Sequence, residues 1–281
     1  MYTIIKRINL TLSILLPALL ICSFAYAQDQ DHQLADRHWH KAQDLEKRGK
    51  YNEAVKYLEE AMTIFKKLGQ EDKIATCLSH LGGIYKSVGS YDRAIEYLEE
   101  ALEIDKRLGM EDKAAIRLSN IGDVYDSQGQ YDKAIEYLED VLRINKKLGM
   151  EADAAIRLNS IGRVLETQGK YGRAIEYFEK ALNIDRKLEQ DDKISIGLAN
   201  IGNIFKSRKQ YDTAIKYYEN ALDIDKKLGQ GDKVVLQLAN IGGVYETQGK
   251  YVKAWKYYEE ALDTAETVNQ DNNIAIGLAN I

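Results

Sequence analysis

Residues 111–150 read EDKAAIRLSN IGDVYDSQGQ YDKAIEYLED VLRINKKLGM, and this stretch decides the fold. Its apolar residues recur at intervals of three and four, as from Leu118 to Ile121, which places them along one side of an α-helix. Gly129 stands between the two apolar runs and Gly149 follows the second, where glycine suits the left-handed backbone conformation of a helix end. The stretch therefore predicts two amphipathic helices joined by a tight turn.

The same pattern returns every 40 residues along most of the chain. Two positions show the period without a break: Tyr51, Tyr91, Tyr131, Tyr171, Tyr211 and Tyr251, and Ala54, Ala94, Ala134, Ala174, Ala214 and Ala254. Self-similarity at a fixed period of this length indicates stacked helix pairs that bury one continuous core. We therefore expect an all-α repeat protein.

The first residues differ from the repeats. Lys6 and Arg7 precede an apolar run, and the small residues Ala25 and Ala27 follow it, which is the pattern of a secretory signal peptide. We predict cleavage between Ala27 and Gln28, and hence a secreted or periplasmic protein. An uncleaved anchor stays an alternative, because the apolar run approaches the roughly 20 residues that span a bilayer. Only in that case do we expect the membrane to be a partner.

Composition limits the kind of partner and the source of stability. Removing residues 1–27 takes away two basic residues and no acidic residue, which moves the formal net charge from −5 to −7. Such a charge argues against nucleic acid as a partner. Cys77 is then the one cysteine left, so stability has to come from packing and not from an internal disulfide.

Catalytic and metal-binding patterns do not stand out from the repeats. We find no nucleophile-elbow glycines and no phosphate-binding loop, and we assign the acidic residues to helix ends and solvated faces. His32, His38 and His40 lie near one another, but no cysteine or carboxylate set accompanies them at the spacing of metal ligands. We therefore expect no enzymatic activity, no metal and no small-molecule cofactor.

Glycine recurs inside the first helix of five repeats, where it costs up to about 1 kcal/mol relative to alanine. These glycines are Gly82, Gly122, Gly162, Gly202 and Gly242. We expect them to allow close approach of the second helix through small residues such as Ala94 and Ala134. Tyr218 and Tyr258 replace the leucines of earlier repeats, which predicts either bulkier packing or the start of a contact surface.

Nine residues of the quoted repeat match the tetratricopeptide signature in order and spacing: Leu118, Ile121, Gly122, Tyr125, Gly129, Tyr131, Ala134, Leu138 and Val141. The sequence thus resembles the tetratricopeptide repeat (TPR) proteins. Its 40-residue period is similar to that of Pins-type adaptors, kinesin light chains and bacterial TPR regulators. The resemblance implies a right-handed superhelical solenoid of antiparallel helix pairs that binds a protein or an extended peptide in its groove.

The expected organisation has four parts. They are a signal peptide at 1–27, the degenerate first helix of the N-terminal repeat at 28–50, the TPR array at 51–270, and the start of a truncated repeat at 271–281. Because that last segment restarts a first helix and then stops, we expect the chain to be a fragment of a longer protein.

Candidate binding residues lie on the first helices, opposite the core. Asn120, Asn200 and Asn240 share one repeat position, and an amide both donates and accepts hydrogen bonds. The resembling families use asparagines on this helix to hold the main chain of a peptide. Neighbouring positions on the same face would set sequence preference: Asp123, Arg163, Asn203 and Lys206. The alternative is that these asparagines cap loops or face water.

Two functions follow from this interpretation. The leading hypothesis is an exported scaffold whose groove binds a partner protein or peptide. The alternative is the N-terminal sensory or regulatory region of a longer signalling protein, whose C-terminal effector is a kinase or a caspase-like protease. Relatives of the second kind are known among bacterial TPR proteins, so this alternative rests on resemblance alone.

Overall fold

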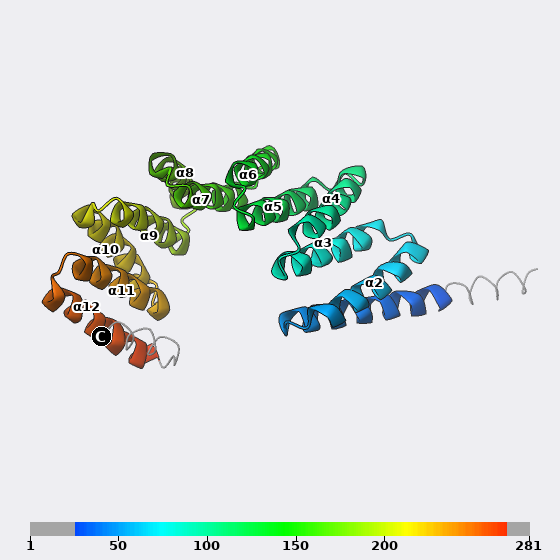
Figure 1. Cartoon of the computed structure of the whole chain (residues 1–281), viewed down its shortest axis with the longest axis horizontal. Helices are drawn as coiled ribbons and strands as arrows, with labels where there is room; N and C mark the ends of the chain where they lie inside the picture. Colours follow the sequence, from blue (N-terminus) through cyan, green and yellow to red (C-terminus); the bar gives the residue numbers. More distant parts are fainter. Residues whose placement is uncertain (1–25, 269–281) are drawn as a thin grey trace, which may run out of the picture. The chain divides into compact units, whose positions relative to one another are not determined.

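The computed structural model describes residues 26–268, and all the regular structure in that range is α-helical. A first helix covers residues 26–47. It is followed by α2 (Tyr51–Leu68), α3 (Glu71–Ser87), α4 (Tyr91–Arg107), α5 (Glu111–Ser127), α6 (Tyr131–Lys147), α7 (Glu151–Thr167), α8 (Tyr171–Lys187), α9 (Asp191–Ser207), α10 (Tyr211–Lys227), α11 (Gly231–Thr247) and α12 (Tyr251–Val268) (Figure 1). The predicted all-α fold of helix pairs is confirmed. Most of the predicted signal peptide and the predicted truncated repeat at 271–281 lie outside the described residues.

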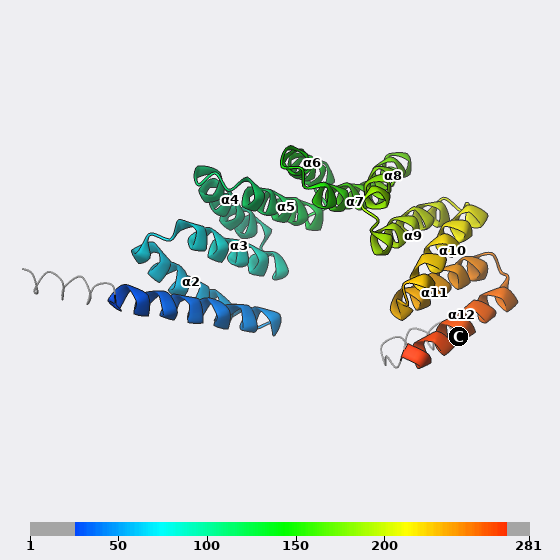
Figure 2. The same ribbon diagram turned by 180° about the vertical axis from the view of Figure 1, so that it is seen from behind.

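The described chain divides into two compact units on either side of the boundary between Gln128 and Gly129, and these are residues 26–128 and residues 129–268. In the N-terminal unit α2 packs on α3, α3 on α4 and α4 on α5, and in the C-terminal unit each helix from α6 to α12 packs on the next. Figure 2 shows, within each unit, successive helices running in opposite directions. Between residues 26 and 268, no helix is both long enough and apolar enough to cross a bilayer.

Each helix from the first to α11 is followed by a residue in the same left-handed backbone conformation, both within a helix pair and between pairs. The N–H of Gly109 donates to the carbonyl three residues earlier at 3.1 Å, and φ at this glycine is +70°. Glu189 and Lys209 replace glycine at equivalent positions but keep φ at +54° and +58°. A side chain in this region costs about 1–2 kcal/mol. Packing between the helices therefore imposes the turn even where the local sequence opposes it.

Four interior glycines of the first helices lie directly beneath large side chains of the second helices: Gly82, Gly162, Gly202 and Gly242. A Cβ on Gly162 would be 2.6 Å from Cε1 of Phe178, and a Cβ on Gly82 would be 2.6 Å from Cγ of Leu98. The predicted close approach is confirmed, but its expected partner was wrong. The alanine contributes a main-chain contact, with the Ala94 carbonyl oxygen at 3.1 Å, whereas the ring or branched side chain one turn later fills the space.

The acidic residues are not all at helix ends or on solvated faces, which corrects the sequence-based assignment. Asp105 and Asp225, in the last turn of α4 and α10, are completely buried. Nε of Arg117 donates to Asp105 at 3.0 Å, and Nε2 of Gln237 donates to Asp225 at 3.2 Å. A buried carboxylate is tolerated when it is paired, and here the donor comes from the first helix of the next repeat.

Asp185 of α8 occupies the same repeat position but lacks such a partner. It is completely buried, and neither of its carboxylate oxygens has a donor among the described residues. The residue equivalent to Arg117 and Gln237 is Gly197, which supplies no side chain. Burial raises the pKa of Asp185, and the charge of nearby Lys193 opposes that rise.

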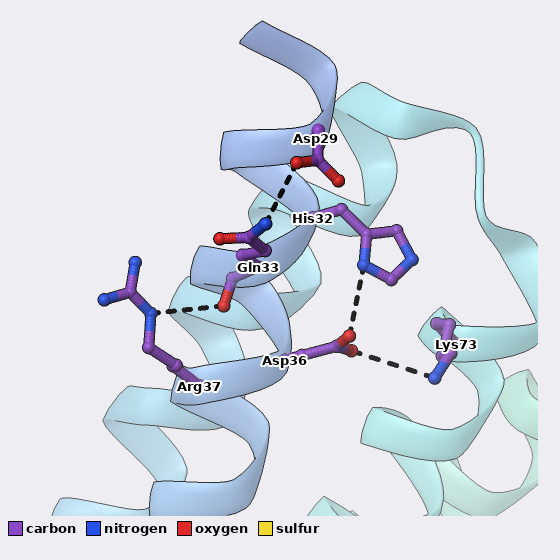
Figure 3. Close-up of polar contacts among 6 residues, drawn as sticks. All are labelled: Asp29, His32, Gln33, Asp36, Arg37 and Lys73. Atoms are coloured by element: carbon purple, nitrogen blue, oxygen red, sulfur yellow. Dashed lines mark hydrogen bonds and ion pairs between the residues drawn. The ribbon is translucent and has the colours of Figure 1, made fainter. Parts of the chain in front are cut away.

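Surface ion pairs connect the N-terminal helix to its neighbours. Figure 3 shows the carboxylate of Asp36 between Nδ1 of His32, at 3.1 Å, and Nζ of Lys73 on α3, at 3.8 Å. Lys67 of α2 reaches Asp31 at 2.6 Å. Exposed pairs of this kind contribute about 0–1 kcal/mol each, so they orient this helix more than they stabilise it.

The glycine contact gives a first prediction. We expect Gly162→Ala to destabilise the fold by about 1–3 kcal/mol, because the added Cβ overlaps the ring of Phe178. Gly172→Ala, in the neighbouring helix α8, is the matched control, since a Cβ there meets no atom within 4 Å. The control should be neutral or stabilising by up to about 1 kcal/mol. Urea denaturation of both variants measures the difference, and equal midpoints would contradict the packing account.

Asp185 gives a second prediction. Because its pKa is raised in the fold, folding favours the protonated acid, and the wild-type protein loses stability as pH rises through the unfolded and then the folded pKa. Asp185→Asn removes this dependence and should raise the free energy of unfolding at about pH 7 by about 1 kcal/mol. The advantage should shrink towards about pH 3, where the carboxyl group is protonated in both states.

Gly197→Gln tests whether the missing partner is the cause. We expect this glutamine to repeat the pair made by Gln237 and to stabilise the wild type more than it stabilises Asp185→Asn. A double-mutant cycle should give a coupling of about 0.5–3 kcal/mol between residues 185 and 197. Additive effects of the two substitutions would contradict the pairing.

Candidate functional site

Each first helix presents one side to the core and the opposite side to solvent. On α9, Leu198 and Ile201 are buried, while Ile196, Asn200 and Asn203 follow one another at i, i+4 and i+7 on the other side. We call this side, with its equivalents on α5, α7 and α11, the outward face. All the residues singled out from the sequence lie on it, Asn120 and Asp123 in the N-terminal unit and the others in the C-terminal unit.

The three predicted asparagines are half-buried but differ in their contacts. Asn120 donates from Nδ2 to the hydroxyl of Ser79 on α3 at 3.3 Å. Asn200 and Asn240 make no side-chain hydrogen bond anywhere in the part of the chain that the structure describes. In the C-terminal unit, therefore, the donors and acceptors of two half-buried side-chain amides are not used by other residues of the described chain.

Two other described residues at this repeat position, His80 and Ser160, are engaged within the protein. Nδ1 of His80 is 2.9 Å from a carboxylate oxygen of Glu46, and the hydroxyl of Ser160 donates to the main-chain carbonyl of Ile156 at 3.1 Å. The capacity for external hydrogen bonds is consequently concentrated on α9 and α11.

The residues predicted to set sequence preference are Asp123, Arg163, Asn203 and Lys206. Two of them, Asn203 and Lys206 on α9, make contacts with neighbouring helices. Oδ1 of Asn203 accepts a hydrogen bond from the hydroxyl of Tyr218 on α10 at 2.7 Å. Nζ of Lys206 is 3.4 Å from the position that a Cβ on Gly243 would take, so the ammonium group lies over α11. These contacts bring side chains of α9, α10 and α11 together at one end of the outward face.

The other two of these four residues, Arg163 and Asp123, are exposed. Burial raises the pKa of Glu166, and the guanidinium of Arg163 one turn earlier on α7 opposes the shift. Asp123 lies on α5 in the N-terminal unit, and its main-chain carbonyl accepts a hydrogen bond from the hydroxyl of Ser127 at 2.8 Å. Arg163 thus shares the C-terminal unit with Asn203 and Lys206, whereas Asp123 does not.

The sequence analysis missed a row of exposed aliphatic side chains next to the asparagines. Ile116, Ile196 and Leu236 are 53%, 43% and 54% exposed, and Ile156 at the same repeat position is half-buried. They lie four residues before the asparagine position and hence one turn away on the same face. The sequence could have predicted this row, because an aliphatic residue recurs every 40 residues on the side of the helix opposite the core.

The structure also decides between the two interpretations of Tyr218 and Tyr258. Both rings are buried over glycines, so the packing is indeed bulkier, and both hydroxyls hydrogen-bond to side chains of the outward face. Tyr258 donates to Oε2 of Glu246 at 2.8 Å. Burial, and then the hydrogen bond to Glu246, raise the pKa of Tyr258 to about 12. The phenols therefore remain neutral donors at physiological pH.

A separate cavity of about 430 Å³ lies at the ends of α6 and α8 and the start of α7. Its polar lining includes Lys146, Asn183, and the ion pair of Lys187 with Glu151 at 2.7 Å. The pair satisfies the two charges within the protein, which leaves the outward face as the stronger candidate.

Among residues 26–268, no three His, Cys, Asp or Glu side chains are grouped so that they could hold a metal ion.

A sequence profile described as the tetratricopeptide repeat matches residues 36–107, 73–147, 112–187 and 193–267. The chain belongs to the tetratricopeptide-repeat family. The TPR fold is a scaffold suited to protein–protein interaction. Among curated proteins, no sequence is significantly similar to this TPR chain.

Solved structures share the fold at low sequence identity. A STAND protein with a tetratricopeptide repeat sensor, from Pyrococcus horikoshii, is 19% identical with a TM-score of 0.70, covering 85% of this chain and 37% of that one. A putative kinesin light chain from Podosopora anserina is 20% identical with a TM-score of 0.60, covering 71% and 98%. A Rap protein complexed with Competence and Sporulation Factor is 13% identical with a TM-score of 0.57, covering 86% and 72%. The predicted likeness to kinesin light chains and bacterial regulators is confirmed at the level of the fold.

Proposed function

We propose that this TPR chain is an exported scaffold that binds an extended segment of a partner protein on its outward face. The observation that carries the proposal is the pairing of Asn200 and Asn240, whose amides have no hydrogen bond within the described chain, with the exposed Ile196 and Leu236. Amides can hold the main chain of a peptide irrespective of its sequence. The aliphatic row adds contact area for apolar side chains of the same segment.

Charge and comparison support a protein partner. The formal net charge of −5 disfavours nucleic acid, and Arg163 and Lys206 lie on the same side of the C-terminal unit as the asparagines. The similar Rap structure holds the Competence and Sporulation Factor, so a fold of this type accommodates a partner molecule. The partner segment proposed here is apolar at the positions that meet Ile196 and Leu236.

The binding prediction uses substitutions on α9 and α11 with matched controls on second helices. We expect Asn200→Ala with Asn240→Ala, and separately Ile196→Ser with Leu236→Ser, to weaken binding of a peptide selected on the wild type from a displayed random library. The loss should be at least about tenfold, which corresponds to about 1.4 kcal/mol. Isothermal titration calorimetry measures it, and thermal melting checks that the variants remain folded.

Asn220→Ala on α10 and Val252→Ser on α12 are the controls, because these residues are an exposed asparagine and an 87% exposed valine away from the outward face. Both should bind like the wild type. If the asparagine double variant and the Asn220 control bind the peptide with equal affinity, the proposed binding on the outward face is refuted.

Export has its own test. We expect the protein isolated from the cell envelope or the medium to begin at Gln28, because Ala25 and Ala27 fit the small-residue requirement of signal peptidase. Mass spectrometry of the intact protein decides this. A protein that retains Met1 and remains in the cytoplasm would contradict export while leaving the binding proposal intact.

A second candidate function is the sensory region of a longer signalling protein. It is favoured by the fold shared with the STAND repeat sensor, in which the match covers 37% of that chain. Determining the coding sequence beyond the codon for Ile281 separates the two roles. An open frame that leads into an effector domain supports the sensor, and a stop codon supports the independent scaffold.

A further inference from the structure

Two side chains on the outward face of the C-terminal unit are held from beneath by tyrosines of the second helices. Tyr218 of α10 is completely buried, and its ring lies over Gly202, where a Cβ would be 2.8 Å from Cε1. The hydroxyl of Tyr218 donates a hydrogen bond to Oδ1 of Asn203 on α9 at 2.7 Å. The glycine is what allows a phenol from the core to reach this face.

The next repeat has the same arrangement with a different acceptor. The ring of Tyr258 lies over Gly242, where a Cβ would be 2.6 Å from Cε1, and its hydroxyl donates to Oε2 of Glu246 at 2.8 Å. Gly243 beside it carries no side chain, and the phenolic oxygen is 3.7 Å from the place of a Cβ there. The hydroxyl therefore lies close to the surface that a partner would cover.

These hydrogen bonds decide which atoms face outward. An asparagine amide has one acceptor oxygen and one donor nitrogen. When Oδ1 of Asn203 is occupied by a phenol beneath it, Nδ2 is directed to the other side as a donor. A carboxylate has two acceptor oxygens, so Glu246 still offers one after Tyr258 has engaged the other.

The chain contains its own comparison for this device. Leu98 and Phe178 occupy the equivalent position in earlier repeats, pack over Gly82 and Gly162 in the same way, and carry no hydroxyl. Apolar packing over the glycine thus needs no phenol. The two hydroxyls are an addition of the last two repeats, on α10 and α12, and each ends on an outward-face side chain.

We propose that Tyr218 and Tyr258 are positioning residues that fix Asn203 as a hydrogen-bond donor and Glu246 as a hydrogen-bond acceptor towards the partner segment. The inference rests on the proposed function and deepens it. The partner presents an acceptor, such as a main-chain carbonyl, opposite Asn203, and a donor, such as a main-chain N–H or a basic side chain, opposite Glu246. The two tyrosines thereby set polarity and register of the bound segment without touching it.

The first test needs no ligand. NMR of full-length Tyr218→Phe should show the signals of the Asn203 side-chain NH₂ group moving towards ordinary solvent-exposed chemical shifts. The group should also show faster internal motion than in the wild type. Tyr217→Phe is the matched control, because Tyr217 is the adjacent half-buried tyrosine. Its ring stacks on that of Phe205, with 5.4 Å between the ring centroids. The control should leave the Asn203 signals unchanged. Tyr218→Phe should fold, since Phe178 is accepted at the equivalent position.

The second test uses the peptide selected on the wild type. We expect Tyr218→Phe to weaken its binding by about tenfold, and Asn203→Asp to weaken it at least as much, because an acceptor then replaces the outward donor. Thermal melting accompanies both, since a purely structural role would move stability and leave affinity in folded protein unchanged.

The outcomes separate the two proposals. Unchanged Asn203 signals together with unchanged affinity in Tyr218→Phe would overturn the positioning role. Failure of the wild type to select any peptide would count against the proposed function, and the NMR comparison would still decide whether the tyrosine orients Asn203.

Discussion

The repeat depends on one steric constraint, the contact between a glycine in the first helix and a large side chain of the second. A Cβ at Gly162 would be 2.6 Å from the ring of Phe178, so the two helices approach as closely as they do only because that atom is missing. Interiors packed at this density do not absorb an extra methyl group without strain. The contact fixes the distance between the helices of a pair, and the position of the outward face follows from it.

The same contact lets the repeats with Tyr218 and Tyr258 connect the core to the outward face by a hydrogen bond. A side chain that lies over the glycine can extend past the first helix, and its tip then determines what emerges on the far side. Leucine and phenylalanine end in the core, whereas Tyr218 and Tyr258 end in hydrogen bonds to Asn203 and Glu246. Packing and recognition are thus connected through a single position of the repeat.

Packing also overrides the local sequence at places where the repeat departs from its consensus. Glu189 and Lys209 adopt the left-handed conformation that glycine takes elsewhere, and Asp185 stays buried although Gly197 has replaced the donor found in other repeats. Each departure costs stability, and the neighbouring repeats hold the geometry in place. A repeat array tolerates such losses because each helix pair is supported on both sides.

The sequence by itself determined the helix pairs, their 40-residue period, the glycine ends and the family, because these depend on local spacing of apolar and small residues. It also placed the asparagines on one face, since residues four apart on a helix are neighbours. Only the tertiary structure showed that Asn120 donates to Ser79, while the side chains of Asn200 and Asn240 have no hydrogen bond among residues 26–268. It alone revealed the buried carboxylates and the hydrogen bonds from tyrosine hydroxyls to side chains of the outward face. These features depend on contacts between different helices, and the spacing of residues within one helix carries no record of them.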